Sequence, residues 1–232
     1  MWVGGVGSHF LTGQAPRDAK WAAPAFLFLA ALIVLLTTGR AGLARLLTAS
    51  GLGFAAEAVG VRYGFVFGVY SYTRELGPQI FGVPLAMACA WMALVAYADQ
   101  MLPDRLPVAV RATIAALWLT AIDLVIDPLA AGELGYWHWA NRGAYYGIPA
   151  SNFAGWFTVS VLIFGLVGLL FGRGRQRNSL ARHIGLSLIL FFTFIALAHQ
   201  FAVITIIGVL LCLVHFVLVY LRAGKRRGEI NR

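Results

Sequence analysis

Residues 184–220 read IGLSLILFFTFIALAHQFAVITIIGVLLCLVHFVLVY, an almost unbroken apolar run. About 20 apolar residues in a helix are enough to cross a bilayer, so the run is too long for one crossing and suits two. The polar pair His199–Gln200 divides it near the middle. The run therefore predicts a helical hairpin in a membrane, with helices at 183–199 and 202–221.

Apolar stretches of similar length recur upstream of this hairpin. They predict helices at 21–38, 43–60, 83–100, 108–127 and 152–171. Of the 232 residues, 60% are hydrophobic and 12% are charged, against about 25% charged residues in a soluble domain. This composition excludes a soluble globular domain, a disordered chain and a disulfide-rich scaffold. We predict an all-α, polytopic transmembrane bundle of about seven helices, with one domain over 21–221 between a polar tail (1–20) and a basic tail (222–232).

The basic residues indicate how the chain is oriented. The formal net charge is +9, and the Lys and Arg residues lie mainly in short loops and in the C-terminal tail, as the positive-inside rule requires of cytoplasmic segments. With seven helices, thirteen of the 18 fall on the side of the C-terminus. We expect a multi-pass protein of the plasma membrane with a cytoplasmic C-terminus, surrounded by lipid and without a nucleic-acid partner. The two long loops, 61–82 and 128–151, then share the outer side.

Three carboxyl groups lie near the outer ends of the predicted spans. Glu57 is in the last turn of the second span, and Asp123 and Asp127, four residues apart, share one face of the fourth. An ionisable group at membrane depth is costly and indicates a functional site. Because burial and a neighbouring carboxylate both disfavour ionisation, one carboxyl can keep its proton and act as an acid while another acts as a base.

A structural role is the alternative for these groups. They can form helix–helix hydrogen bonds or ion pairs, for which the cations on this side are Arg62, Arg74 and Arg142. Asp127 precedes Pro128 and can simply end its helix. Asp99 lies at the opposite end of its span, near Asp104 and Arg105, and indicates an interfacial charge.

The two outer loops combine aromatic residues with Gly and Pro. They read RYGFVFGVYSY (62–72) and GYWHW (135–139), and the second continues with YYGIP (145–149). An interfacial aromatic belt accounts for single Trp and Tyr residues, whereas the interleaved Gly and Pro favour ordered loops that fold back on the bundle. Aromatic faces also stabilise cations.

Common cofactor motifs are missing from the sequence. No two of the five His residues are three or four apart, so neither a His-box di-iron site nor an HExxH zinc site is expected. A dinucleotide-binding fingerprint is also absent. Lys20 and Lys225 lie outside the predicted spans, which excludes a retinal Schiff base. We expect no cofactor and no metal. His138, between two Trp residues, can relay protons, although a surface His is the simpler interpretation.

The two loops and the helix ends beside them resemble one known family, the carotenoid biosynthesis membrane proteins. In the first half, the similar residues are Glu57, Gly60, 63–64 (YG), 67–72 (FGVYSY), 76–78 (LGP), 82–84 (GVP) and Trp91. In the second half, they are Asp123, 127–128 (DP), Trp137, Trp139, Gly143, 145–149 (YYGIP), 152–153 (NF) and 155–156 (GW). The similarity covers about residues 43–171, and the remaining helices match only as apolar spans.

The resemblance implies a carotenoid 1,2-hydratase, a hydro-lyase that adds water to the terminal double bond of an acyclic ψ-end without a cofactor. Protonation of the alkene leaves a tertiary cation, which water captures. Asp123 or Glu57 would be the acid, and the other of these two or Asp127 the base. We expect Asn152 to hold the water. The residues expected to line the end-group pocket are Tyr70, Tyr72, Trp137, Tyr145, Tyr146 and Trp156.

Two other functions use the same features. A carotenoid or lipid carrier, or a subunit that binds other carotenoid biosynthesis enzymes, accounts for the aromatic loops but gives no reason for three carboxyls at one depth. A membrane carotenoid cyclase uses the same acid and the same cation but excludes water. Hydration adds one water to the mass of the pigment, whereas cyclisation and binding leave the mass unchanged.

Overall fold

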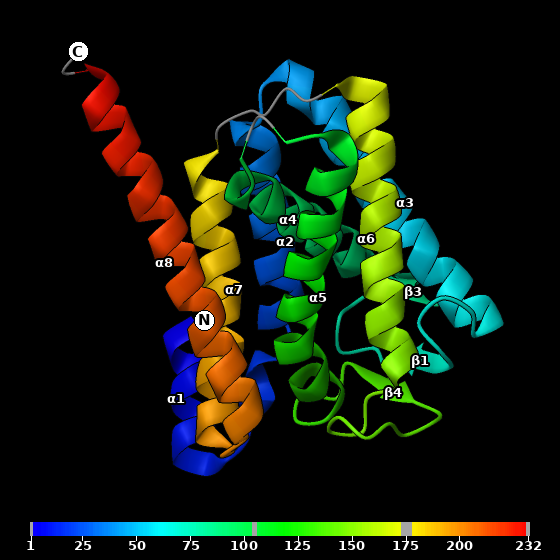
Figure 1. Cartoon of the computed structure of the whole chain (residues 1–232). Coiled ribbons are helices and arrows are strands. Elements are labelled where there is room, and N and C mark those ends of the chain that lie inside the picture. Colours follow the sequence, from blue (N-terminus) through cyan, green and yellow to red (C-terminus); the bar gives the residue numbers. More distant parts are fainter. Residues whose placement is uncertain (1, 104–105, 173–177, 231–232) are drawn as a thin grey trace.

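The computed structural model of the chain describes residues 2–103, 106–172 and 178–230. These residues form an all-α bundle with two small antiparallel sheets at one end (Figure 1). The helices are α1 (Trp2–Thr12), α2 (Ala22–Thr37), α3 (Arg40–Tyr63), α4 (Leu85–Met101), α5 (Val108–Ala131), α6 (Ala150–Phe171), α7 (Ser179–Ala198) and α8 (Ala202–Ile230), and a 3-10 turn covers Arg17–Ala19.

The described helices have the length and composition of a membrane bundle. Helices α5, α6 and α7 and the Ala202–Leu221 part of α8 are each long and apolar enough to cross a bilayer. Helices α2 and α4 are apolar but shorter. Helix α3 is long but carries charged residues, among them Arg45 and Glu57. The predicted all-α transmembrane fold is confirmed.

Helix α4 lies at the centre of the bundle. It contacts α2, α3, α5, α7 and α8, and its Trp91 and Tyr97 side chains are fully buried. Helix α8 lies at the edge, and its C-terminal half extends beyond the other helices (Figure 1). Many of its large apolar side chains are exposed, as expected for a helix that faces lipid. Helix α8 continues through most of the segment expected as a basic tail.

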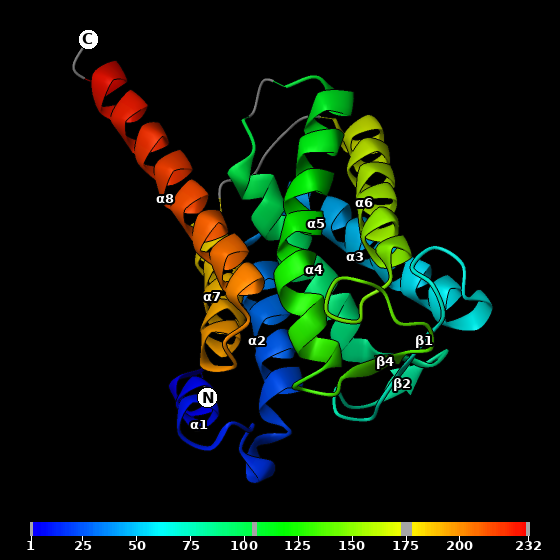
Figure 2. The same ribbon diagram turned by 60° about the horizontal axis from the view of Figure 1, so that its bottom comes forward.

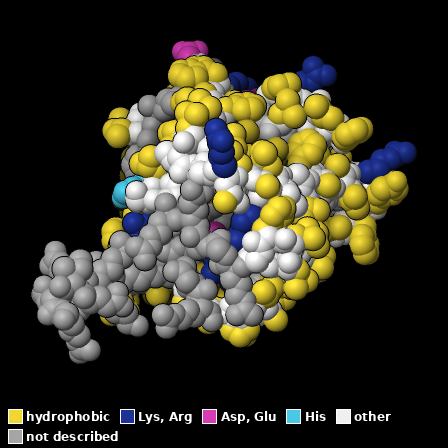
Figure 3. Space-filling model, turned by 90° about the horizontal axis from the view of Figure 1, so that it is seen from above, with side chains coloured by type: hydrophobic (Ala, Val, Ile, Leu, Met, Phe, Trp, Pro, Cys, Tyr) yellow, Lys and Arg dark blue, Asp and Glu magenta, His cyan; other side chains and the backbone are white. Residues whose placement is uncertain are grey.

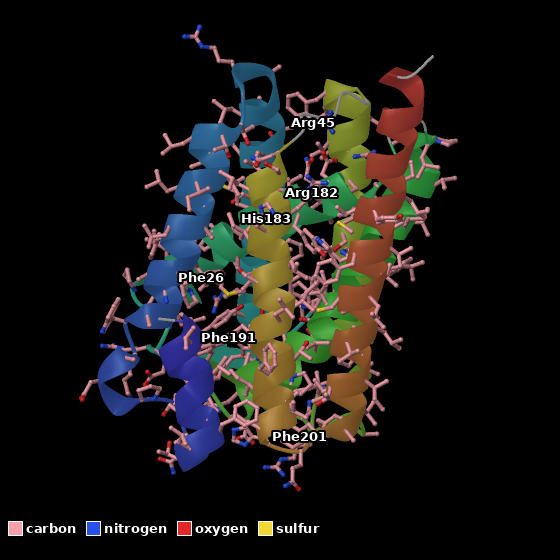
Figure 4. All side chains as sticks on the ribbon, turned by 90° about the vertical axis from the view of Figure 1, so that its left-hand side faces the viewer. Phe26, Arg45, Arg182, His183, Phe191 and Phe201 are labelled. Atoms are coloured by element: carbon pink, nitrogen blue, oxygen red, sulfur yellow. The ribbon has the colours of Figure 1, made fainter. Side chains whose placement is uncertain are left out.

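The N-terminal segment differs from the polar tail expected there, because it contains helix α1. Figure 4 shows α1 beside α7, near the level of Phe191. Val6 is buried, and the imidazoles of His9 and His199 form a hydrogen bond of 3.0 Å. One apolar and one polar contact thus hold this helix on the bundle.

Pro128 does not end helix α5, contrary to the alternative considered for Asp127. The helix continues to Ala131, although a proline has no N–H to donate to the carbonyl four residues earlier. That carbonyl belongs to Leu124, and it accepts a hydrogen bond from the Tyr145 hydroxyl at 3.0 Å. A side chain from the following loop therefore replaces the missing backbone donor.

The two long loops meet at one end of the bundle, as the predicted topology requires (Figures 1 and 2). Strand β1 (Tyr70–Tyr72) pairs antiparallel with β4 (Trp137–Trp139). Strands β2 (Gln79–Ile80) and β3 (Val83–Pro84) form a separate hairpin. The β1–β4 register places Tyr70 opposite Trp139 and Tyr72 opposite Trp137.

The opposite end of the bundle carries separate Lys and Arg side chains among apolar ones (Figure 3). Here Asp99, expected as an interfacial charge, pairs with Arg111, whose Nη2 lies 2.5 Å from the carboxylate. Asp104 and Arg105, and the basic residues at 173–177 and 231–232 used in the orientation argument, lie outside the described residues.

Candidate active site

Three carboxyl side chains surround one cavity near the loop end of the bundle. Glu57 comes from α3, and Asp123 and Asp127 come from successive turns of α5. All three are buried, with at most 3% of their surface exposed. In the described part of the chain, none of them forms an ion pair with an arginine. The grouping expected from the sequence is therefore present, and Arg62, Arg74 and Arg142 are not its counter-ions.

Glu57 is held by three hydrogen bonds from aromatic side chains. The Tyr70 hydroxyl donates to Oε2 at 2.5 Å and the Tyr72 hydroxyl to the same oxygen at 2.8 Å. The indole N–H of Trp91, in α4, donates to Oε1 at 3.1 Å. Tyr70 and Tyr72 are two apart in β1, so both side chains project from the same face of the strand. Each available oxygen of Glu57 thus has a donor.

Asp127, in α5, is held in the same way by two aromatic donors from the paired strand β4. The indole N–H of Trp137 donates to Oδ1 at 2.6 Å, and that of Trp139 donates to the same oxygen at 3.3 Å. These two residues are also two apart, in β4, and His138 between them is exposed. Four aromatic donors therefore project from one face of the β1–β4 pair towards two carboxyls on different helices.

Asn152 joins the two aspartates of α5. It lies in the first turn of α6, and its Nδ2 donates to Oδ2 of Asp123 at 2.7 Å and to Oδ2 of Asp127 at 2.6 Å. An amide nitrogen has two hydrogens, so both are used by carboxyls. Its amide nitrogen thus positions the two aspartates, and its expected role in holding a water stays a prediction.

The tyrosine donors remain protonated. Tyr70 and Tyr72 lie in β1, outside the membrane-spanning segments. Burial, and then the negative charge of Glu57, raise the pKa of both phenols above the ordinary value of 10. The two hydroxyls therefore act as hydrogen-bond donors to Glu57 throughout the physiological pH range.

Two residues expected in the pocket lie outside the cavity. The Tyr145 hydroxyl is bonded to the Leu124 carbonyl, and burial raises its pKa to about 12. Tyr146 is 40% exposed, and its ring meets that of Phe201 edge-on at 5.3 Å. Both side chains support the loop that follows α5 rather than line the space between the carboxyls.

Four residues of the site were not among the predicted site residues. Phe67, Met87 and Trp139 line the cavity, and Trp91 donates to Glu57. The alternation of Trp137 with Trp139, like that of the two tyrosines, is a strand signal that identifies Trp139. No comparable signal marks Phe67 or Met87.

The cavity between the carboxyls has a volume of about 20 Å³. That is room for one water molecule, which occupies roughly 10–15 Å³ on this measure. Polar donors and acceptors surround the space on one side, and the stacked rings of Trp91 and Trp156, 4.4 Å apart, lie beside it. The arrangement can hold a proton on one carboxyl, present a water to another and surround a cation with aromatic faces.

Helices α3, α4, α5 and α6 all contribute residues to the carboxyl cavity. A larger cavity, of about 70 Å³, lies at the opposite end of the same four helices. Its one acidic residue, Asp99, is neutralised by the adjacent guanidinium of Arg111. Arg45 also lies 4.0 Å from that carboxylate. The three carboxyls without an arginine partner in the described structure therefore lie at the smaller cavity. Among the described residues, no three His, Cys, Asp or Glu side chains are arranged to hold a metal ion.

Comparison with known proteins identifies the family of the chain. Residues 22–219 match the family model described as carotenoid biosynthesis protein. Bisanhydrobacterioruberin hydratase of Haloarcula japonica is 35% identical over 154 residues, which make up 62% of this chain. The match spans about half (49%) of that relative's length. No solved structure matches the chain. The chain therefore belongs to the carotenoid biosynthesis protein family.

Proposed function

We propose that this protein is a carotenoid hydratase that adds water to the terminal double bond of an acyclic ψ-end. The observation that carries the proposal is the cavity between Glu57, Asp123 and Asp127, which combines three buried carboxyls with aromatic walls. Membership of the family supports a carotenoid substrate, and the hydratase name of the Haloarcula japonica relative supports hydration.

Asp123 is the proposed acid. In the described structure it accepts one hydrogen bond, from Asn152, whereas Glu57 and Asp127 accept three each. Hydrogen-bond donors stabilise the ionised form of a carboxylate. Of the three groups, Asp123 is therefore the one that most readily keeps a proton. It transfers that proton to the less substituted alkene carbon, which leaves a tertiary cation on the other.

The cation is stabilised by charge and by aromatic faces. Glu57 borders the same cavity, and its three hydrogen-bond donors stabilise the ionised form of its carboxyl. The rings of Trp156 and Tyr70 border the same cavity. An aromatic face stabilises a desolvated cation by up to about 2 kcal/mol, and it does not form a bond with it.

Asp127 is the proposed base. Water attacks the tertiary carbon and forms the new C–O bond, and Asp127 accepts the proton that this water loses. The reaction is balanced, since one proton from Asp123 and one hydroxyl from water have been added to the double bond. Because Asp123 lies one helical turn away, the proton can return to it through a single water and reset the site.

The membrane orientation is part of the same proposal. The excess of Lys and Arg in the segments on the C-terminal side supports a cytoplasmic C-terminus. The carboxyl cavity then lies near the outer surface of the plasma membrane.

Pigment mass spectrometry tests the proposal. The chain is expressed in cells that accumulate lycopene or a C50 precursor, beside Asp123→Asn and Glu57→Gln variants. Glu75→Gln is the matched control, because it makes the same chemical change in a loop carboxylate that pairs with Lys20. We expect the wild type and the control to give pigment heavier by one water, and both site variants to lose this product.

Two other outcomes would overturn the proposal. A new pigment of unchanged mass and altered retention would indicate cyclisation. Unaltered pigment, with the wild-type protein present in the membrane and the pigment bound to it, would indicate a carrier.

A further inference from the structure

The carboxyl cavity does not admit the end of a carotenoid in this conformation. Its volume of about 20 Å³ is that of a single water, whereas the hydratase reaction requires a branched alkene between the carboxyls. Part of the wall must therefore move when pigment binds. The wall consists mostly of residues on helices and of hydrogen-bonded strand residues, with Phe67 as the exception.

Phe67 fills a slot between two helices. Its ring is 2% exposed and lies between Gly60 of α3 and Gly155 of α6. A Cβ added to Gly60 would lie 2.9 Å from the ring, and one added to Gly155 would lie 2.8 Å from the ring and closer still to the carbonyl oxygen of Val66. The ring and the backbone beside it therefore leave no room for a side chain at either position. On the inner side, the ring faces Tyr70 and Trp156 across the cavity, with centroids 6.2 Å and 6.3 Å away. The slot thus joins the cavity and has the thickness of an aromatic ring.

The segment that carries Phe67 has a strained backbone. Val66 has a φ of +80°, a value that a β-branched residue adopts only under strain. Gly64 and Gly68 on either side also have positive φ values, +64° and +113°. The segment contacts α6 through a hydrogen bond of 3.0 Å from the Ser151 hydroxyl to the Phe67 carbonyl, and through the Val66 carbonyl, which lies against Gly155. Backbone strain of this kind clusters at active sites, ligand clamps and switch regions.

Apolar side chains next to the Phe67 segment in the chain are exposed. Tyr63, the last residue of α3, and Phe65 are each 74% exposed, and the end of α3 projects from the bundle beside β1 (Figure 2). A pigment dissolved in the bilayer meets these side chains without entering water.

We propose that the slot between Gly60 and Gly155 binds the conjugated chain of the substrate. In this proposal the Phe67 side chain fills the slot in the absence of pigment, as a plug, and moves out of it when pigment binds. The inference rests on the proposed hydratase function, because only a carotenoid end group has to reach the carboxyls. A conjugated polyene is planar and as thin as a phenyl ring, so it fits between two glycine backbones. When Phe67 moves out, the polyene takes its place and its end reaches Asp123.

A reversible crosslink tests the proposal. In a Gly68→Cys, Ser151→Cys variant, the new Cβ atoms would be 4.0 Å apart, within the range of about 3.5–4.5 Å found in disulfides. The disulfide ties the plug segment to α6. The reduced form of the same protein is the control, because it carries the same strain at position 68 and lacks the same Ser151 hydrogen bond.

Pigment binding and hydration are measured separately. We expect the oxidised variant to bind at least about tenfold less lycopene in detergent than the reduced one, because the open state is withheld, and to form correspondingly less hydrated product. Equal binding by both forms overturns the slot. Reductant-dependent binding without any hydrated product, in the variant and in the wild type, supports the slot and overturns the hydratase proposal.

A second pair of variants does not depend on a crosslink. Phe67→Leu shrinks the plug, and we expect lycopene to bind faster. Adding Gly60→Ala narrows the emptied slot, because apart from the Phe67 ring the nearest atom to the new methyl group is the Tyr70 hydroxyl at 3.0 Å, and we expect the gain to disappear. If Gly60→Ala leaves the faster binding of Phe67→Leu unchanged, pigment does not pass between the two glycines.

Discussion

Replacing Asn152 by Leu tests the arrangement of the two aspartates. The change keeps a similar volume but removes both amide hydrogens, which donate to Asp123 at 2.7 Å and to Asp127 at 2.6 Å. A hydrogen bond to a neutral partner contributes about 0.5–1.5 kcal/mol, and one to a charged partner about 1.5–3 kcal/mol. With Asp123 neutral and Asp127 ionised, the variant should lose roughly 2–4 kcal/mol.

This loss is measurable as a shift of the melting temperature in detergent. For a chain of this length, 1 kcal/mol corresponds to about 2–4 °C, so the expected decrease is about 4–16 °C. Thr158→Val is the matched control, because Thr158 is exposed on the same helix and its hydroxyl bonds only to the Ala154 carbonyl. The control should shift by no more than about 2 °C. A decrease in Asn152→Leu no larger than in the control, together with full hydratase activity, would refute the bridge between the aspartates.

Three further predictions follow from individual contacts. Trp137→Phe should lower hydration more than Trp139→Phe, measured as product per membrane protein, because its bond to the shared carboxylate oxygen is 2.6 Å against 3.3 Å. Tyr145→Phe should lower the melting temperature by about 2–4 °C, since it leaves a partly buried carbonyl without its side-chain donor, while pigment is still hydrated. Burial, and then His199, lower the pKa of His9 below its ordinary 6.5, so folding favours the neutral form. Stability should be full above pH 6.5 and decrease as the pH falls further, and His9→Phe should flatten this decrease in a melting series from pH 8 to 5.

The helices and the carboxyl cluster were predictable because their signals are local. Apolar runs of spanning length define the helices. The spacing of Asp123 and Asp127 places both on one face of α5. Glu57 lies in the last turn of the predicted span 43–60, which ends on the same side of the membrane. Each of these inferences uses residues that lie within one helix, where the period is fixed.

The interactions between segments were not predictable in the same way. Asn152 lies 25 residues from Asp127, and the sequence does not specify that its amide bonds to two carboxyls instead of to water. Pro128 by its local rule ends a helix, and only a hydroxyl from the next loop allows the helix to continue. Phe67 is one of many aromatic residues in its loop. Its role in the structure depends on two glycines in other elements.

The pairing of β1 with β4 has a consequence for how the protein folds. It joins Tyr70 to Trp139 across almost 70 positions of the chain, and contacts of such long sequence separation form slowly because loop closure is entropically costly. The helices can insert and pack before this ribbon exists. An intermediate of that kind contains Glu57 and Asp127 without their four aromatic donors, so their charges are poorly stabilised in it. Completion of the ribbon is therefore the step that assembles the candidate site on an inserted bundle, and mutations in either loop should slow maturation before they affect the final stability.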